Sequence, residues 1–283
     1  MSYADRLLQL KRAPSQILLH VVLLASGLFF LLPFIWMIST SLKFNDQLMT
    51  TTPRILSWPL DWANYPDALI FGNLLGYVKN SVILVLVNLV GTLLSCSLAA
   101  YAFARLRWPG RDFFFLVLLA TLMVPAEVTM VPRFLIFHAL GWVNTFLPLT
   151  VPSFLGAPFF IFLLRQFFAS LPRELEDAAR IDGASFAGVY RYIIVPLSQP
   201  ALAAVAIFNF QGVWNDFINP LIYLNSNNLK PLSLGLYVFL QENISYWNLL
   251  MAASTLMTIP VIVVFFLAQR YFIQGITLTG LKG

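Results

Sequence analysis

Long uninterrupted apolar runs dominate the hydrophobic pattern of this chain. A helix that crosses a bilayer needs about 20 mainly apolar residues. Six runs reach that length, and polar stretches separate them. They cover residues 16–40, 78–103, 113–132, 146–168, 200–224 and 249–272. The pattern predicts an all-α membrane protein with six transmembrane helices, and an even number of spans places both termini on the same side.

The polar stretch 169–199 carries the start and stop signals of short helices. Pro172 suits the first turn of a helix, where its missing N–H costs nothing. Gly183 suits a helix stop, and Ser185 can cap the helix that follows. We therefore predict two short helices that are joined at Gly183, the second of which ends at Pro196.

Composition and charge exclude a soluble globular protein and set an orientation. The 283 residues are 59% hydrophobic and only 10% charged, whereas soluble domains carry about 25% charged residues. Twelve of the 17 lysines and arginines fall at the helix ends that include both termini and the stretch 169–199. Because cytoplasmic loops are rich in Lys and Arg, we predict that these ends are cytoplasmic. The chain is then a multi-pass protein of the cytoplasmic membrane.

A spaced motif lies within this predicted cytoplasmic loop. Its members, with three, nine and one residues between them, are Asp177-Ala178-Ala179, Gly183, Ile193 and Val195-Pro196. The motif resembles the EAA loop in the permease subunits of bacterial ABC importers. That loop reads Glu-Ala-Ala, three residues, Gly, nine residues, Ile, one residue and Leu-Pro. Asp177 replaces its Glu, although Glu176 stands beside it, and Val195 replaces its Leu.

The resemblance extends over nearly the whole chain. Residues 171–185, 100–106, 214–216 and 275–283 all resemble the carbohydrate-importer branch, and more closely its second, maltose-type permease. The resemblance implies the type I ABC importer permease fold, with residues 1–283 forming a single transmembrane permease domain.

The resemblance implies that this loop contains a coupling helix, which docks on an ATP-hydrolysing subunit. Small Ala178 and Ala179 would allow close approach, and Glu176 and Asp177 would offer acceptors to the partner. The implied coupling residues are Glu174, Glu176, Asp177, Ala178, Ala179, Arg180, Gly183 and Pro196. The alternative is a solvated hairpin with internal salt bridges, for which Glu176 and Arg180 have the favourable i,i+4 spacing.

The resemblance also implies an assembly. A second permease subunit would complete a heterodimer, two ATPase subunits would hold ATP and Mg, and an extracytoplasmic binding protein would deliver a sugar substrate. This chain itself would bind no cofactor, and neither its charge nor its motifs call for nucleic acid as a partner.

Polar side chains within the predicted span 200–224 are candidates for the substrate pathway. The candidates are Asn209, Gln211, Trp214, Asn215, Asp216 and Asn219. Gln211, Asn215 and Asn219 share one helix face at i,i+4 spacing. A charge deep in a bilayer costs about 2.5–3.5 kcal/mol, so we expect Asp216 to face a partner helix or a wet cavity. An equal alternative is that these residues join the helices of two permease subunits.

Catalysis by this chain is not indicated, and two other transport functions stay open. No nucleophile–base grouping and no metal-ligand cluster stands out, and the single Cys96 excludes an intramolecular disulfide. An ATP-independent secondary transporter would use Asp216 and Glu127 as proton carriers. An importer of glycerol-3-phosphate or another polar solute would favour inward-facing Arg or Lys within the spans. None is evident in the sequence, which favours a neutral sugar.

Overall fold

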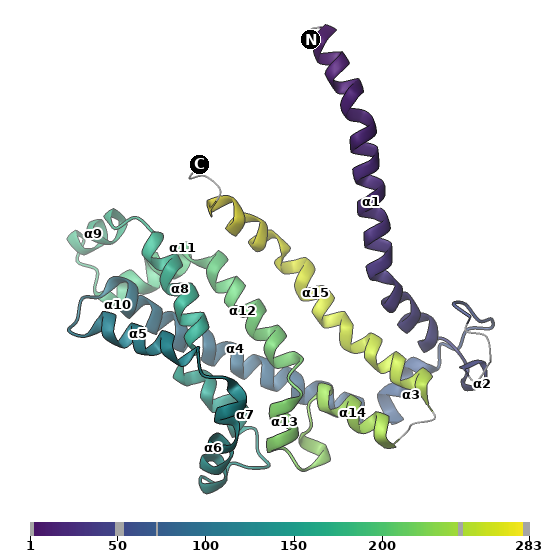
Figure 1. Ribbon diagram of the computed structural model, residues 1–283. Helices are drawn as coiled ribbons and strands as arrows, with labels where there is room; N and C mark the ends of the chain where they lie inside the picture. The colour runs from purple at the N-terminus through teal and green to yellow at the C-terminus, as the bar shows by residue number, and fades with distance from the viewer. Residues whose placement is uncertain (1–2, 49–53, 72, 243–245, 280–283) are drawn as a thin grey trace. The chain divides into compact units, whose positions relative to one another are not determined.

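The computed structural model of the chain describes residues 3–48, 54–71, 73–242 and 246–279, and every regular element in that part is helical (Figure 1). The chain divides into two compact units, which are described separately. One comprises Met1–Leu69 and Glu242–Leu256, and the other comprises Ile70–Gln241 and Met257–Gly283. The last four residues of the matched segment 275–283 lie outside the described residues.

The helices differ widely in length, and the long ones carry the apolar runs. The longer helices are α1 (Tyr3–Ser41), α4 (Leu74–Arg105), α5 (Arg111–Thr121), α6 (Ala126–Ala139), α8 (Pro158–Ser170), α12 (Gln199–Trp214), α14 (Leu232–Glu242) and α15 (Trp247–Thr279). The shorter elements are α2 (Asn45–Leu48), α3 (Asn64–Phe71), α7 (Leu147–Thr150), α9 (Glu174–Ile181), α10 (Phe186–Val189), α11 (Val195–Leu197), α13 (Ile218–Tyr223), the 3-10 turns η1 (Val151–Leu155) and η3 (Asn227–Leu229), and the π-helical turn η2 (Tyr190–Ile194).

Most of the predicted spans are confirmed as helices. The runs 16–40, 78–103 and 249–272 lie within α1, α4 and α15, and 146–168 is covered by α7, η1 and α8. By length and composition, four helices of the described chain can cross a membrane, or up to six if each of two bent helix pairs is one span.

The run 113–132 is a bent helix pair rather than one straight helix. Helices α5 and α6 meet at 98° across a short break. The cause is Pro125, which lacks an N–H and disfavours helical backbone at Val124. Glu127 is exposed in the first turn of α6.

The run 200–224 is also interrupted. Helix α12 ends at Trp214, and α13 begins at Ile218. Between them, Asp216 Oδ1 accepts a hydrogen bond from the backbone N–H of Asn219 at 3.2 Å. A carboxylate that bonds a nearby backbone N–H favours a new helix start over continuation of the old helix.

In the first unit, the buried Asn64 joins three segments by its side chain. Its amide nitrogen donates to the carbonyl oxygens of Ser41 at 3.0 Å and Lys43 at 2.9 Å. Its amide oxygen accepts from Asn248 Nδ2 at 2.7 Å. These bonds tie the end of α1 and the start of α15 to α3. By contrast, the apolar side chains of α1 from Leu18 to Ile35 are exposed, as suits a helix that faces lipid or another subunit.

In the second unit, α8 and α12 lie alongside α4 (Figure 1). Their contact surface is built from small and apolar residues, among them the fully buried Cys96, Ala100, Leu164 and Val205. Gly91 is required where α4 meets η1, because a Cβ there would lie 2.3 Å from Ser153 Oγ. Small residues let helices approach closely, which is the usual basis of helix packing within membranes.

Candidate functional site

The predicted helical hairpin exists, and Gly183 makes its turn. Helix α9 ends in front of Gly183, whose φ of +86° favours glycine. Its N–H donates to the Arg180 carbonyl at 3.0 Å. Ser185 then caps α10 by accepting from the Gly188 N–H at 3.2 Å. The helix stop and the cap are therefore confirmed. We call residues 174–189 the coupling hairpin, after the role that the resemblance of the sequence implies for them.

Pro196 does not end the second helix, contrary to the sequence prediction. The chain continues from α10 through η2 and α11 to Leu197, and the bend into α12, of 77°, follows it. Pro196 sits in the first turn of α11. Pro196 follows the π-helical turn η2, in which the Val195 N–H donates to the Tyr190 carbonyl, and the helical path ends at Leu197, one residue later.

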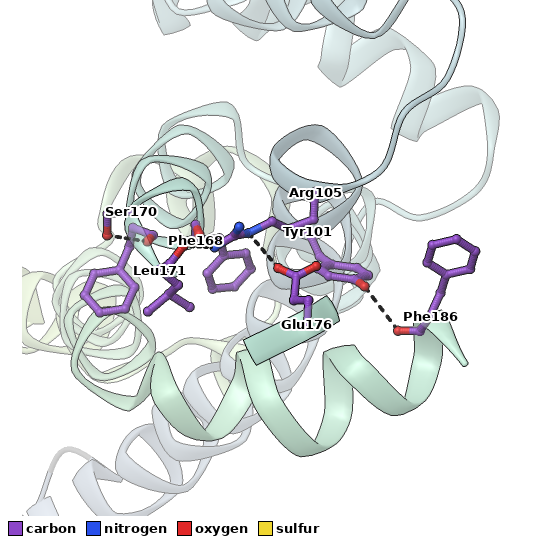
Figure 2. A network of polar contacts seen from close by, with 8 residues as sticks. Tyr101, Arg105, Phe168, Ser170, Leu171, Glu176 and Phe186 are labelled. Carbon is purple, nitrogen blue, oxygen red and sulfur yellow. Dashed lines mark hydrogen bonds and ion pairs between the residues drawn. The ribbon is translucent and has the colours of Figure 1, made fainter. Parts of the chain in front are cut away.

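Glu176 points into its own chain rather than outward (Figure 2). Its Oε1 lies 3.0 Å from Arg105 Nε, and the two side chains are 8% and 2% exposed. Arg105 Nη2 also donates to the carbonyl oxygens of Leu171, at 2.6 Å, and Phe168. One guanidinium therefore joins the end of α4, the end of α8 and the coupling hairpin. Sequence reasoning had assigned the carboxylate of Glu176 to a partner subunit.

The other coupling candidates lie largely on the outer face of the hairpin. Arg180 lies over the Phe186 ring at 4.5 Å, and no ion pair in the described chain joins it to Glu176. Ile181 is 87% exposed. Ala179 is half-buried, and the remaining candidates are exposed: Glu174, Asp177, Ala178, Gly183 and Pro196.

A cavity of about 610 Å³ lies at the break between α12 and α13. Asp216 and Asn219 line it, as do Arg133 from α6 and Asn88 from α4. Asp216 Oδ2 accepts from Asn219 Nδ2 at 2.9 Å, and no ion pair in the described chain joins Asp216 to Arg133. The polar groups stand on otherwise apolar walls, an arrangement typical of small-molecule sites.

The other four pathway candidates do not line this cavity. Asn209 is buried and donates to Thr92 Oγ1 of α4 at 3.0 Å. Trp214 is buried, and its Nε1 donates to the Met257 carbonyl at 3.2 Å. Gln211 and Asn215 are exposed. The predicted stripe therefore separates into cavity residues, ties between helices, and an exposed pair.

Sequence reasoning missed three residues of the cavity. Arg133 was placed at a helix end, Asn88 is a lone amide in an apolar span, and Tyr223 closes the run 200–224. Tyr223 is 2% exposed, yet its hydroxyl has no hydrogen-bond partner among the described residues. A buried phenol usually finds a partner. The isolated amide of Asn88 was the one signal that the sequence offered.

The broken apolar helices, the cavity between them and the exposed charged hairpin define a class of protein, a multi-pass membrane transport component. The chain belongs to the family of binding-protein-dependent transport system inner membrane components, whose model matches residues 91–278. The family consists of transporter permeases, not enzymes.

Relatives from sugar-transport systems match most of the chain. It is 41% identical to the arabinooligosaccharides transport system permease protein AraQ of Halalkalibacterium halodurans, over 72% of this chain and 73% of that protein. It is 32% identical to the trehalose/maltose transport system permease protein MalG of Thermococcus litoralis, over 95% of this chain and 97% of that protein.

The fold also matches a solved transporter. A chain of a bacterial ABC transporter involved in the import of the acidic polysaccharide alginate superposes with a TM-score of 0.78 and 25% identity, over 96% of this chain and 99% of that one. The chain therefore has the fold of an ABC importer permease.

Proposed function

We propose that this chain is one of two permease subunits of an ATP-driven importer for a sugar or oligosaccharide. It crosses the bacterial cytoplasmic membrane six times as a single permease domain, with both termini and the coupling hairpin in the cytoplasm. A second permease subunit completes the pore, and an extracytoplasmic binding protein delivers the sugar. Two ATPase subunits bind ATP and Mg and drive the cycle.

The observation that carries this proposal is the outer face of the coupling hairpin. It presents Asp177, Ala178 and the almost fully exposed Ile181 on a structure fixed by Gly183 and Ser185. Leu175 and Phe186 of the same hairpin are exposed as well, and several exposed apolar side chains on one small element favour a protein–protein contact. A secondary transporter has no use for such a surface.

The relatives and the lining of the cavity support a sugar as the substrate. The names of two relatives refer to arabinooligosaccharides and to trehalose or maltose. The wall of the cavity includes the carboxylate of Asp216, the amides of Asn88 and Asn219 and the guanidinium of Arg133. Sugar hydroxyls both donate and accept hydrogen bonds, so this mixture of groups suits them.

An anionic cargo is the second candidate, and Arg133 favours it. The sequence showed no inward-facing cation within the spans, but Arg133 lines the cavity without an ion-pair partner in the described chain. Glycerol-3-phosphate or an acidic sugar in the same importer class would use this guanidinium.

The coupling assignment is tested by Gly183→Pro in the assembled transporter. Proline cannot adopt the φ of +86° and lacks the N–H that bonds Arg180. A displacement of about 1 Å can lower the rate of a process that depends on precise geometry by a large factor. We therefore expect uptake and substrate-stimulated ATPase activity to fall about tenfold or more. Membrane insertion should persist.

Gly141→Pro is the matched control. Gly141 also has a positive φ, of +69°, and its N–H donates to the His138 carbonyl at 3.0 Å, but it lies outside the hairpin. ATP hydrolysis in this control should still respond to loaded binding protein. Normal coupling in the Gly183→Pro transporter would refute the assignment of the hairpin.

A further inference from the structure

One face of α4 contacts the coupling hairpin and η2 at three successive turns. Ser97, Tyr101 and Arg105 are four residues apart, so they project from the same side of the helix. Ser97 Oγ lies 2.7 Å from the hydroxyl of Tyr190. Tyr101 OH donates to the Phe186 carbonyl at 3.3 Å (Figure 2). Arg105 forms the ion pair with Glu176. Each of the last three turns of α4 therefore has a polar contact with the coupling hairpin or with η2.

Arg105 differs from the other two residues because it joins three elements through charge. Its guanidinium neutralises Glu176 and also serves the last carbonyls of α8, where a cation is favoured by the helix dipole. The side chain is 2% exposed, so water has little access to either set of contacts. Loss of Arg105 leaves a buried carboxylate and helix-end carbonyls without a partner.

Helix α4 continues without a break from Arg105 to the cavity. It runs from Leu74 to Arg105 and contains no proline. At 1.5 Å per residue, about 25 Å separate Arg105 from Asn88, which lines the cavity. Between these two residues, Thr92 accepts the hydrogen bond from Asn209 of α12. A displacement of α4 along its axis would therefore move Asn88 at the cavity wall and Thr92, which bonds α12.

We propose that Arg105 is a positioning residue that passes movement of the coupling hairpin to α4 and so to the cavity. The inference rests on the proposed function. It divides the two adjacent acids by role: Glu176 is the internal anchor that moves with α4, and Asp177 is the acid that faces the ATPase subunit.

The test is a double-mutant cycle in the assembled importer, with Arg105→Gln, Glu176→Gln and the double variant. Each single change leaves one buried charge unpaired, whereas the double change removes both charges. We expect each single variant to lower uptake and the stimulated-to-basal ATPase ratio by about tenfold, with ATPase subunits still co-purifying. The double variant should recover to within about threefold of wild type, because no charge is left unpaired.

Two controls separate this inference from the proposed function. Asp112→Asn breaks the exposed Arg111–Asp112 pair, of 2.9 Å, and should change neither readout. Asp177→Lys should reduce co-purification of the ATPase subunits. If Asp177→Lys reduces co-purification and both Gln single variants couple normally, the positioning role of Arg105 is refuted and the proposed function stands. If the double variant is as impaired as both singles together, Arg105 and Glu176 do not act as a pair. If Asp177→Lys and both singles have no effect, the proposed function fails as well.

Discussion

Glu176 at the coupling hairpin and Asp216 at the cavity are both carboxylates in a largely apolar chain, and their surroundings differ. Glu176 lies 3.0 Å from Arg105 Nε, and both side chains are almost fully buried. Asp216 is half-buried and accepts two hydrogen bonds from Asn219. Arg133 lines the same cavity but forms no ion pair with it in the described chain.

The difference shows how one chain uses buried charge in two ways. A direct ion pair that also bonds helix-end carbonyls fixes three segments in one geometry, and breaking it is costly. A carboxylate held by an amide keeps lone pairs for a further donor. Glu176 therefore has its charge matched within the chain, whereas Asp216 keeps acceptor capacity beside the cavity, as the proposed function requires of a residue in the substrate pathway.

The largest expected effect is the loss of stability in Arg105→Ala, compared with Arg133→Ala. Arg105→Ala should lower the free energy of unfolding by about 3–5 kcal/mol, because Glu176 stays buried without its cation. Arg133→Ala should change it by no more than about 0.5 kcal/mol, because it breaks no ion pair. Thermal denaturation of the purified transporter measures both. Equal shifts in melting temperature would remove the distinction between the two ends.

Arg133→Gln sharpens the same comparison through transport. A hydrogen bond to a charged group contributes about 1.5–3 kcal/mol, so uptake at saturating binding protein should fall roughly tenfold. Arg133→Lys is the matched control, since it keeps the charge. Repeating the assay at two salt concentrations with wild type and the Gln variant separates the cargo classes, because an anionic cargo makes the Arg133-dependent part of uptake fall with ionic strength. Unchanged uptake by the Gln variant would exclude Arg133 from the pathway.

The smallest expected effect compares two tyrosine hydroxyls. Tyr101→Phe removes the bond to the Phe186 carbonyl and should destabilise the protein by about 0.5–1.5 kcal/mol. Tyr223→Phe removes a buried hydroxyl with no partner in the described chain, so stability should be unchanged or slightly higher. Uptake should fall in the Tyr223→Phe variant if that hydroxyl bonds the cargo. Paired melting and uptake assays decide, and a clear loss of stability in Tyr223→Phe would contradict the expectation.

Local signals were reliable where the physics is local. The apolar runs predicted α1, α4 and α15, and Gly183 and Ser185 predicted the turn and cap of the hairpin. Apolar length over 113–132 did not reveal the bend between α5 and α6, because the break signal is the single Pro125 within an apolar run. The helix end predicted at Pro196 was wrong by one residue, because the helical path continues through a π-helical turn and ends at Leu197.

The amino-acid sequence by itself determined that this chain is a membrane protein with a charged helical hairpin, and its motif spacing indicated the family. Only the tertiary structure decided which of two adjacent acids is buried. Neighbours on a helix point about 100° apart, and packing against Arg105, far away in the chain, selects Glu176 over Asp177. The cavity has the same origin, since α4, α6 and α13 bring Asn88, Arg133 and Tyr223 together. Such contacts depend on how helices pack, which no local pattern of residues encodes.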